Sequence, residues 1–141
     1  MSSSESSAAA ERALCGLVNG LARQIGEHVR ERAATLGLTA AQATALRELT
    51  GPMTMRELAE RMSCEPSNAT FVVDKLENLG LLERHPHPTD RRARHLVLTA
   101  AGAGLRDRLI ALLVQESPVG ALTAEEQHTL HALLLRAVTS R

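Results

Sequence analysis

Residues 54–99 read TMRELAERMSCEPSNATFVVDKLENLGLLERHPHPTDRRARHLVLT, and this stretch decides the fold of the chain. A short helix is predicted to begin after Thr54, whose hydroxyl caps it while the side chain of Glu57 reaches back to the cap. A brief link leads to Pro66, which suits the first turn of a second helix, and Gly80 suits its end. A short helix, a brief turn and a second helix together indicate a helix-turn-helix.

The same stretch ends in two short segments that break the helical period. Residues 81–84 and 94–98 partly alternate between apolar and polar side chains, which is typical of strands. Between them, HPHPTDRRA (85–93) contains two prolines and no large apolar residue. These features predict a two-stranded hairpin with a long solvated tip. A hairpin directly after the second helix makes the helix-turn-helix winged.

Amphipathic helices are predicted on both sides of this stretch. Over about residues 8–34 the apolar side chains recur at intervals of three and four, which indicates one long helix. Thr39 and Thr123 each precede a Gln or Glu by three residues, so both are predicted to cap helices, and Thr99 is predicted to cap another. The expected fold class is mainly α with a small β-hairpin wing. The side chains expected to be buried in the helices after Pro66 and Thr123 include Ala69, Val72 or Val73, Leu76, Leu79, Leu130, Leu133, Leu134 and Val138.

The chain is predicted to form one structural domain with four parts. Residues 1–8, rich in Ser, are expected to be disordered, residues 9–38 to form a dimerisation helix, residues 39–99 the winged helix-turn-helix, and residues 100–141 the C-terminal dimerisation helices. Dimerisation is expected because the first and last helices carry long apolar faces. A chain of 141 residues with a wing has too little core to cover both faces.

The composition excludes several classes of protein. Apolar residues make up 44% and charged residues 23%, and 16 basic residues balance 16 acidic ones, as in an ordinary globular domain. One Phe and no Trp or Tyr exclude modules that stack bases on rows of aromatic rings. The longest apolar run, residues 109–114, is far below the roughly 20 residues that span a bilayer, and the N-terminus does not resemble a secretory signal. The expected location is the cytoplasm, with no membrane partner, and Cys15 and Cys64 are then free thiols.

Basic charge is concentrated on the predicted hairpin. Residues 84–98 contain four Arg and one Asp, a local net charge of +3. Arg suits contacts with phosphate and with a narrow minor groove, so the hairpin is expected to contact double-stranded DNA. Asp90 is expected to pair with a neighbouring guanidinium and hold the tip in shape. The candidate DNA-binding residues of the wing are Asp90, Arg91, Arg92 and Arg94.

The helix predicted to begin at Pro66 carries a complementary pattern. Small polar side chains near its start allow a helix to enter the major groove, where Asn68 can pair with adenine through two hydrogen bonds. Ser and Thr can donate to bases or phosphates. Phe71 either faces outward, where it can touch a thymine methyl, or fills the core, and the sequence leaves both open. The candidate DNA-binding residues of this helix are Pro66, Ser67, Asn68, Thr70 and Lys75.

Residues 57–102 resemble the centre of a MarR-family transcription regulator. The resemblance covers roughly residues 46–105, and the flanking long helices fit the dimerisation region of that family. It rests on Leu58-Ala59, on S-N-x-T over 67–70, on D-K-L-E-x-x-G-L-x-x-R over 74–84, on Asp90-Arg91-Arg92, and on Leu98-Thr99 with Gly102.

The resemblance implies a homodimer that binds a pseudo-palindromic operator, usually as a repressor released by a small ligand or by oxidation. It places Ser67, Asn68 and Thr70 in the major groove. It also implies that Asp90 and Arg92 correspond to a wing motif that pairs internally and sends an Arg into the minor groove. No cofactor is implied.

Three alternatives remain beside this interpretation. Some relatives sense peroxide through a Cys in the first helix, which makes Cys15 a candidate redox site, but they support the thiolate with tyrosines that this chain lacks. The pairs His85/His87 and His128/His131 lack a third ligand, so no metal site is predicted. A winged helix used only for protein contacts would need no excess of Arg. No catalytic motif is found, so the chain is not expected to be an enzyme.

Overall fold

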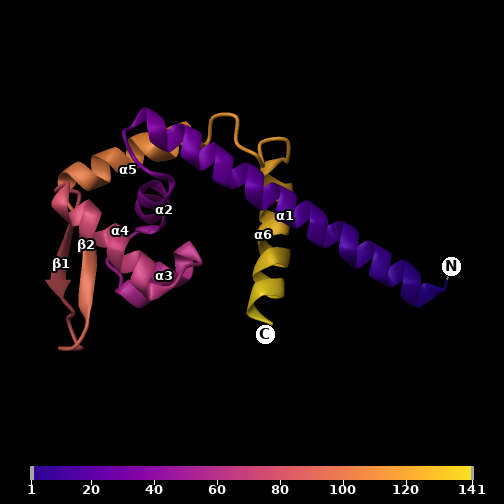
Figure 1. Cartoon of the computed structure of the whole chain (residues 1–141), viewed down its shortest axis with the longest axis horizontal. Coiled ribbons are helices and arrows are strands. Elements are labelled where there is room, and N and C mark those ends of the chain that lie inside the picture. Colours follow the sequence, from indigo (N-terminus) through magenta and orange to yellow (C-terminus); the bar gives the residue numbers. More distant parts are fainter. Residues whose placement is uncertain (1, 141) are drawn as a thin grey trace. The chain divides into compact units, whose positions relative to one another are not determined.

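The computed structural model describes residues 2–140, which form six helices and one two-stranded antiparallel sheet. This confirms the predicted class of a mainly helical protein with a small β-hairpin. None of the helices formed by residues 2–140 is both long and apolar enough to cross a membrane. In chain order the elements are α1 (Ser3–Thr35), α2 (Ala40–Glu48), α3 (Met55–Met62), α4 (Pro66–Asn78), β1 (Leu82–Pro86), β2 (Arg94–Leu98), α5 (Ala100–Leu113) and α6 (Ala124–Thr139) (Figure 1).

The chain divides into two compact units, where the sequence was expected to form one domain. We call Gly26–Leu113 the core unit, and Met1–Ile25 with Val114–Arg141 the terminal unit. Every buried apolar residue of the described chain lies in the core unit. By contrast, residues 2–25 and 114–140 bury no side chain, and the two residues of α1 that are buried, Val29 and Ala33, lie in the core unit.

The threonine caps predicted from the sequence are confirmed. In each box the Thr hydroxyl accepts from the backbone N–H three residues on, and the Gln or Glu at that position accepts from the N–H of the cap. Thr99 likewise accepts from the backbone N–H of Gly102 at 3.1 Å. The three boxes are Thr39 with Gln42, Thr54 with Glu57, and Thr123 with Glu126.

Helix α1 begins at Ser3, so residues 3–8 are helical where disorder was expected. The physical reason is a further capping box. The backbone N–H of Glu5 donates to Ser2 Oγ at 3.3 Å, and the N–H of Ser2 donates to Glu5 Oε2 at 3.2 Å. Met1 lies outside the described residues.

In the core unit the apolar face of α4 packs against α2 and α3. Ala69, Val72, Val73 and Leu76 are buried, which shows that both valines face inward. Leu79, however, was predicted to be buried and is 59% exposed. It is the C-cap of α4 and keeps helical dihedral angles (φ −81°, ψ −1°), so it continues the apolar face past the last residue of the helix, just before the chain turns at Gly80 (φ +74°).

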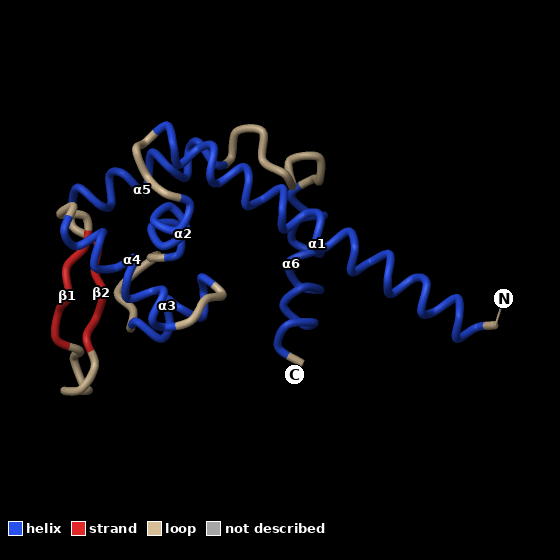
Figure 2. The backbone as a smooth tube through the Cα atoms, in the orientation of Figure 1, coloured by secondary structure: helices blue, strands red, loops and turns tan. Residues whose placement is uncertain are grey.

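The hairpin pairs β1 with β2 from Leu82↔Leu98 to Pro86↔Arg94, and its tip is a loop (Figure 2). A further bridge, not predicted from the sequence, joins Met53 to Leu96. Leu96 N–H donates to Met53 O at 2.7 Å, and Met53 N–H donates to Leu96 O at 3.3 Å. Because Met53 directly precedes the cap of α3, this bridge fixes the wing against the helix-turn-helix.

Helix α5 closes on the segment that leads from α4 into β1. Thr99 N–H donates to Leu81 O at 3.1 Å, and the Thr99 hydroxyl donates to Gly80 O at 2.7 Å. A Cβ atom at Gly102 would lie 2.0 Å from Leu81 O. Only glycine permits this close approach, so Gly102 allows α5 to pack directly against Leu81, the residue before β1.

In the terminal unit no described residue is buried. Four residues of α6 were predicted to be buried; Leu130 is only partly covered, and Leu133, Leu134 and Val138 are exposed. The predicted face exists, but within residues 2–140 it is covered only in part. The large apolar side chains that the terminal unit exposes are Leu14, Leu17, Val18, Val114, Leu133, Leu134, Leu135 and Val138.

Candidate nucleic-acid interface

The outward face of α4 carries the small polar residues that the sequence singled out. Pro66 occupies the first turn of α4. Backbone N–H groups there have no acceptor within the helix, so the missing N–H of proline costs no hydrogen bond. Because the apolar side of α4 faces the core, Ser67, Asn68 and Lys75 are exposed. The structure therefore places these candidate residues together on one accessible helix, with no large side chain between its start and Thr70.

Thr70 differs from the other polar residues of α4. Its side chain is partly buried, and its hydroxyl donates to Pro66 O at 2.9 Å. The hydroxyl proton is thus used within the helix, which leaves the oxygen to act as an acceptor.

A cleft of about 400 Å³ separates the helix-turn-helix from the wing. It brings together Thr70 of α4 with Arg92 and Arg94 of the wing, which were predicted separately. Two more arginines line it that were not among the candidate residues, Arg56 from the first turn of α3 and Arg84 from β1. No sequence signal marked Arg56, because its place in the cleft depends on how α3 packs beside β2. The cleft is lined by Thr54, Met55, Arg56, Thr70, Arg84, Arg92, Ala93, Arg94 and Leu96.

Asp90 shapes the wing tip in a different way from the one predicted. Its Oδ1 accepts from the backbone N–H of Arg92 at 3.0 Å, and Ala93 N–H donates to Asp90 O at 3.2 Å. Within residues 2–140 no ion pair joins Asp90 to a guanidinium, so the predicted pairing with an Arg side chain is wrong. Asp side chains commonly accept from a backbone N–H two residues on. This local hydrogen bond replaces the predicted ion pair with a flexible Arg side chain.

Histidines complete the tip. His87 Nδ1 accepts from the backbone N–H groups of Thr89 at 3.1 Å and Asp90 at 3.0 Å. The His87 ring centroid lies 4.4 Å from that of His95. Residues 2–140 contain no group of three or more side chains that could hold a metal ion. His87 therefore has a structural role in the wing, as the acceptor that orders its turn.

The positive charge of Arg84 is already paired within the chain and is not available to a ligand. Its guanidinium pairs with Asp74, and its Nε lies 3.8 Å from Glu77 Oε2, both on α4. This pair fastens β1 to α4 and neutralises Asp74, a carboxylate exposed on the same helix as Asn68. Arg84 contributed to the local charge of +3, so the charge available to a ligand is smaller than the sequence indicated.

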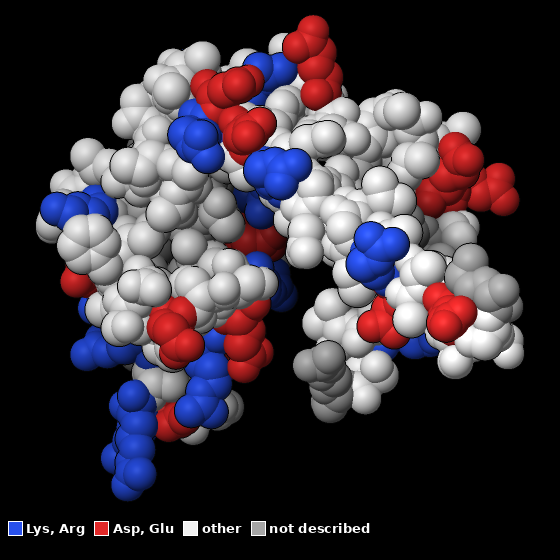
Figure 3. All heavy atoms as spheres, turned by 45° about the vertical axis from the view of Figure 1, so that its right-hand side comes forward, with Lys and Arg blue, Asp and Glu red and all other residues white. Residues whose placement is uncertain are grey.

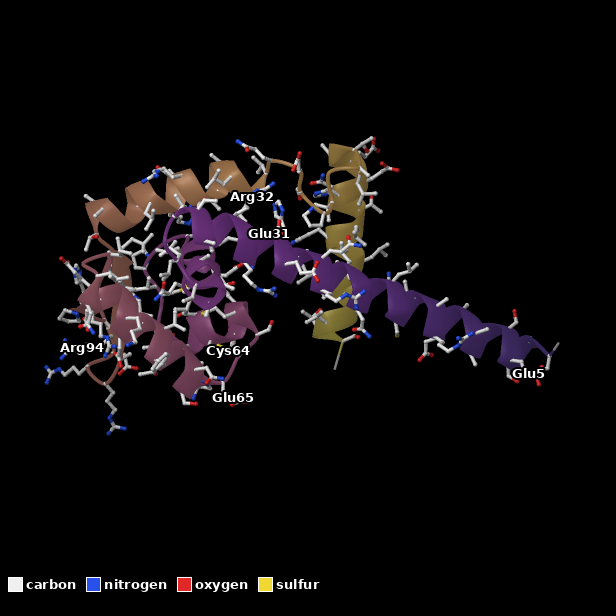
Figure 4. All side chains as sticks on the ribbon, turned by 45° about the horizontal axis from the view of Figure 1, so that its top comes forward. Glu5, Glu31, Arg32, Cys64, Glu65 and Arg94 are labelled. Atoms are coloured by element: carbon white, nitrogen blue, oxygen red, sulfur yellow. The ribbon has the colours of Figure 1, made fainter. Side chains whose placement is uncertain are left out.

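The remaining three arginines of the wing are exposed. In the part of the chain that the structure describes, no carboxylate lies within ion-pair distance of Arg91, Arg92 or Arg94. Figure 3 shows Lys and Arg side chains gathered at the projecting end of the molecule at the lower left, and Figure 4 marks Arg94 on the hairpin. The wing thus presents three guanidinium groups to solvent.

Phe71 faces outward, which settles the choice that the sequence left open. Its side chain is 63% exposed, and Lys75 Nζ lies 5.3 Å from the ring centroid. The sequence did contain a signal. Phe71 lies two residues from both Ala69 and Val73, which are buried, and residues two apart on a helix face opposite ways.

The two cysteines differ in exposure. Cys15 lies on α1 in the terminal unit and is exposed, whereas Cys64, in the turn before α4, is partly covered. Cys15 was a candidate redox site, and in the single chain its thiol is accessible to solvent.

Comparisons with known proteins agree with this geometry. A model of the MarR family matches residues 38–93. The chain is 33% identical over 90 residues to the uncharacterised HTH-type transcriptional regulator YkoM of Bacillus subtilis, covering 62% of this chain and 58% of YkoM. It is 34% identical over 87 residues to the HTH-type transcriptional repressor MdtR of the same organism, covering 60% and 56%. The match spans less than two thirds of these relatives.

The likeness to solved structures extends over more of the chain. A mutant of E. coli MarR complexed with operator DNA is 28% identical, with a TM-score of 0.69. That match covers 89% of this chain and 93% of the E. coli protein. The similarity therefore reaches beyond the winged helix-turn-helix into the terminal helices.

Proposed function

Because this chain belongs to the MarR family, we propose that it is a homodimeric transcriptional regulator that binds a pseudo-palindromic operator in double-stranded DNA. One observation carries the proposal. The core unit presents an accessible polar helix beside a hairpin with three exposed arginines, and a cleft lined by four arginines lies between them. A helix of this kind fits the major groove, while the wing reaches phosphates or the minor groove.

The proposed contacts follow from the exposure of each side chain. On α4, Asn68 reads a base edge, while Ser67 and Lys75 contact bases or phosphates. Pro66 and Thr70 complete the contact surface at the start of the helix. On the wing, Arg92 enters the minor groove and Arg91 and Arg94 contact phosphate. Asp90 supports them by ordering the turn.

The terminal unit supports the homodimer. Eight large apolar side chains of this unit are exposed in the single chain, and exposed groups of apolar side chains mark interaction surfaces. A second copy of the chain would cover them symmetrically and set two α4 helices about one duplex turn apart, roughly 34 Å.

The sign of regulation is proposed from relatives. MdtR is described as a repressor, and the E. coli MarR mutant was solved with operator DNA. We propose that this protein also represses, that a small ligand releases it from DNA, and that it acts in the cytoplasm. No catalytic role is part of the proposal.

Selection from a random pool of duplexes tests the proposal most directly. We expect the full-length protein to enrich an imperfect palindrome whose half-sites are about one helical turn apart. A winged helix that serves only protein contacts enriches no sequence, and that result would overturn the proposal.

Arg92→Ala tests the wing. Loss of a groove contact is expected to weaken binding to the selected operator by about 1–3 kcal/mol and to flatten its salt dependence. Arg108→Ala, an exposed arginine of α5, is the matched control and should leave both unchanged. Mobility-shift titrations at several salt concentrations measure both quantities; equal behaviour of the two variants contradicts the role of Arg92.

Asn68→Ala tests the reading helix. Because its amide is proposed to face base edges, binding to the operator should fall more than binding to a scrambled duplex. Equal losses on the two duplexes would reduce Asn68 to a phosphate contact.

A further inference from the structure

Phe71 is the exposed apolar residue of the core unit that the fold does not explain. Among the described residues of that unit, only Phe71 and Leu79 are large, apolar and more than half exposed. Leu79 is the C-cap of α4, just before the chain turns at Gly80. Phe71 instead lies in the middle of the helix. The inward face next to it is formed by Val72 and Val73, which are buried, so Phe71 adds nothing to the core.

The position of Phe71 on α4 coincides with the proposed reading surface. Phe71 follows Ser67 by four residues and precedes Lys75 by four, and residues at this spacing lie on one face of a helix. All three side chains are exposed. The ring is therefore part of the face that is proposed to enter the major groove.

Lys75 fixes the ring and adds a charge. Its ammonium lies 5.3 Å from the ring centroid, within the range of a cation–π contact. The contact restricts the ring before any partner arrives, which lowers the entropic cost of binding. The other charged neighbour on this face, Asp74, is already neutralised by Arg84. The surroundings of the ring thus favour an anionic partner over an apolar protein surface.

We infer that Phe71 determines specificity by contacting the 5-methyl group of a thymine in each half-site. This inference rests on the proposed function, since it requires α4 to lie in the major groove. Thymine is the base that presents a methyl group there, and an apolar side chain reads it by contact. The ring and the ammonium then act together, with the methyl against the ring and Lys75 beside a phosphate.

The test removes only the methyl group. In the selected operator each thymine is replaced in turn by deoxyuridine, and the affinity of the full-length protein is measured. At one position in each half-site we expect binding to weaken about fourfold, and about fifteenfold when both half-sites are changed, since burial of one methyl-sized group is worth about that factor. Phe71→Ala should bind the thymine and uracil duplexes equally.

Two further variants keep the result interpretable. Leu79→Ala removes the other exposed apolar side chain of this unit and should retain the thymine preference of the unaltered protein. Phe71→Leu keeps an apolar group and should retain part of it. Because each preference is a ratio for one protein on two duplexes, a partly unfolded preparation does not alter it.

The outcomes distinguish a failure of the Phe71 contact from a failure of DNA binding. If an operator is selected but contains no recurrent thymine, if every uracil substitution is neutral, or if Phe71→Ala keeps the full preference, the role of Phe71 is overturned while DNA binding stands. If no sequence is enriched at all, both are overturned.

Discussion

Helix α4 of the core unit and helix α6 of the terminal unit are similarly amphipathic, but α4 buries four residues and α6 buries none. The core unit holds every buried apolar residue of the described chain, whereas the terminal unit holds eight of the ten large apolar residues that are exposed. The same sequence pattern of intervals of three and four thus leads to two outcomes. The pattern indicates that a face must be covered, and only the fold shows whether this chain or another molecule covers it.

The largest expected effect comes from placing a charge on the uncovered face. Leu133→Glu in α6 should weaken the proposed dimer at least 100-fold, because an unpaired buried charge costs about 3–5 kcal/mol and symmetry places two of them in the interface. Sedimentation equilibrium measures the dissociation constant. Leu79→Glu, at a residue of 59% exposure against 54% for Leu133, is the control in the core unit and should remain dimeric. If both variants stay dimeric, the exposed apolar face of α6 is not the surface that binds a second copy of the chain.

The next effect tests the packing of the core unit. Gly102→Ala should destabilise the protein by about 2–4 kcal/mol, because the new Cβ meets Leu81 O at 2.0 Å and backbone must shift. Gly104→Ala, two residues on in the same helix with nothing within 4 Å, should instead be neutral or stabilise by up to about 1 kcal/mol. Urea unfolding distinguishes them, and similar midpoints for the two variants would be evidence against the close approach of α5.

A smaller effect is expected where the wing meets α4. Arg84→Gln leaves Asp74 unneutralised on the proposed reading helix, so operator affinity should fall about tenfold, close to 1.4 kcal/mol. The free energy of unfolding should change by less than about 1 kcal/mol, since Asp74 is 54% exposed. Adding Asp74→Asn to the variant should restore most of the affinity. No restoration in this double variant would show that Arg84 acts on DNA directly.

The smallest effect concerns the turn of the helix-turn-helix. Ser63 has φ +55°, a left-handed conformation that glycine adopts without strain. Ser63→Gly should therefore stabilise the core unit by up to about 1 kcal/mol and leave dimerisation unchanged. Thermal unfolding at several protein concentrations tests this, and a lower melting temperature would show that the Ser63 side chain contributes more than its backbone costs.

The sequence predicted those parts of the molecule that depend on short-range rules. Capping at Thr39, Thr54 and Thr123, and the hairpin over 82–98, follow from residues within a few positions of one another. The resemblance to the MarR family and the candidate face of α4 could also be predicted, because both rest on the same stretch of sequence over residues 67–84.

Other features escaped prediction because they join residues far apart in the chain. The bridge between Met53 and Leu96 and the pairing of Arg84 with Asp74 depend on how the helices pack beside the hairpin. The burial expected for Leu133 failed for a related reason. Periodicity identifies an apolar face without specifying what covers it, and within residues 2–140 Leu133 remains 54% exposed.

Leu96 is held from both sides, by Arg84 of β1 in the hairpin and by Met53 ahead of α3. The wing therefore cannot tilt as a rigid arm about its base without breaking bonds to the helix-turn-helix. We therefore expect bending mainly in the residues beyond the Pro86↔Arg94 pair, where the strand pairing ends. In the proposed complex with DNA, a short flexible tip would let Arg91 and Arg92 adjust to local variation in groove width while α4 keeps its register on the bases.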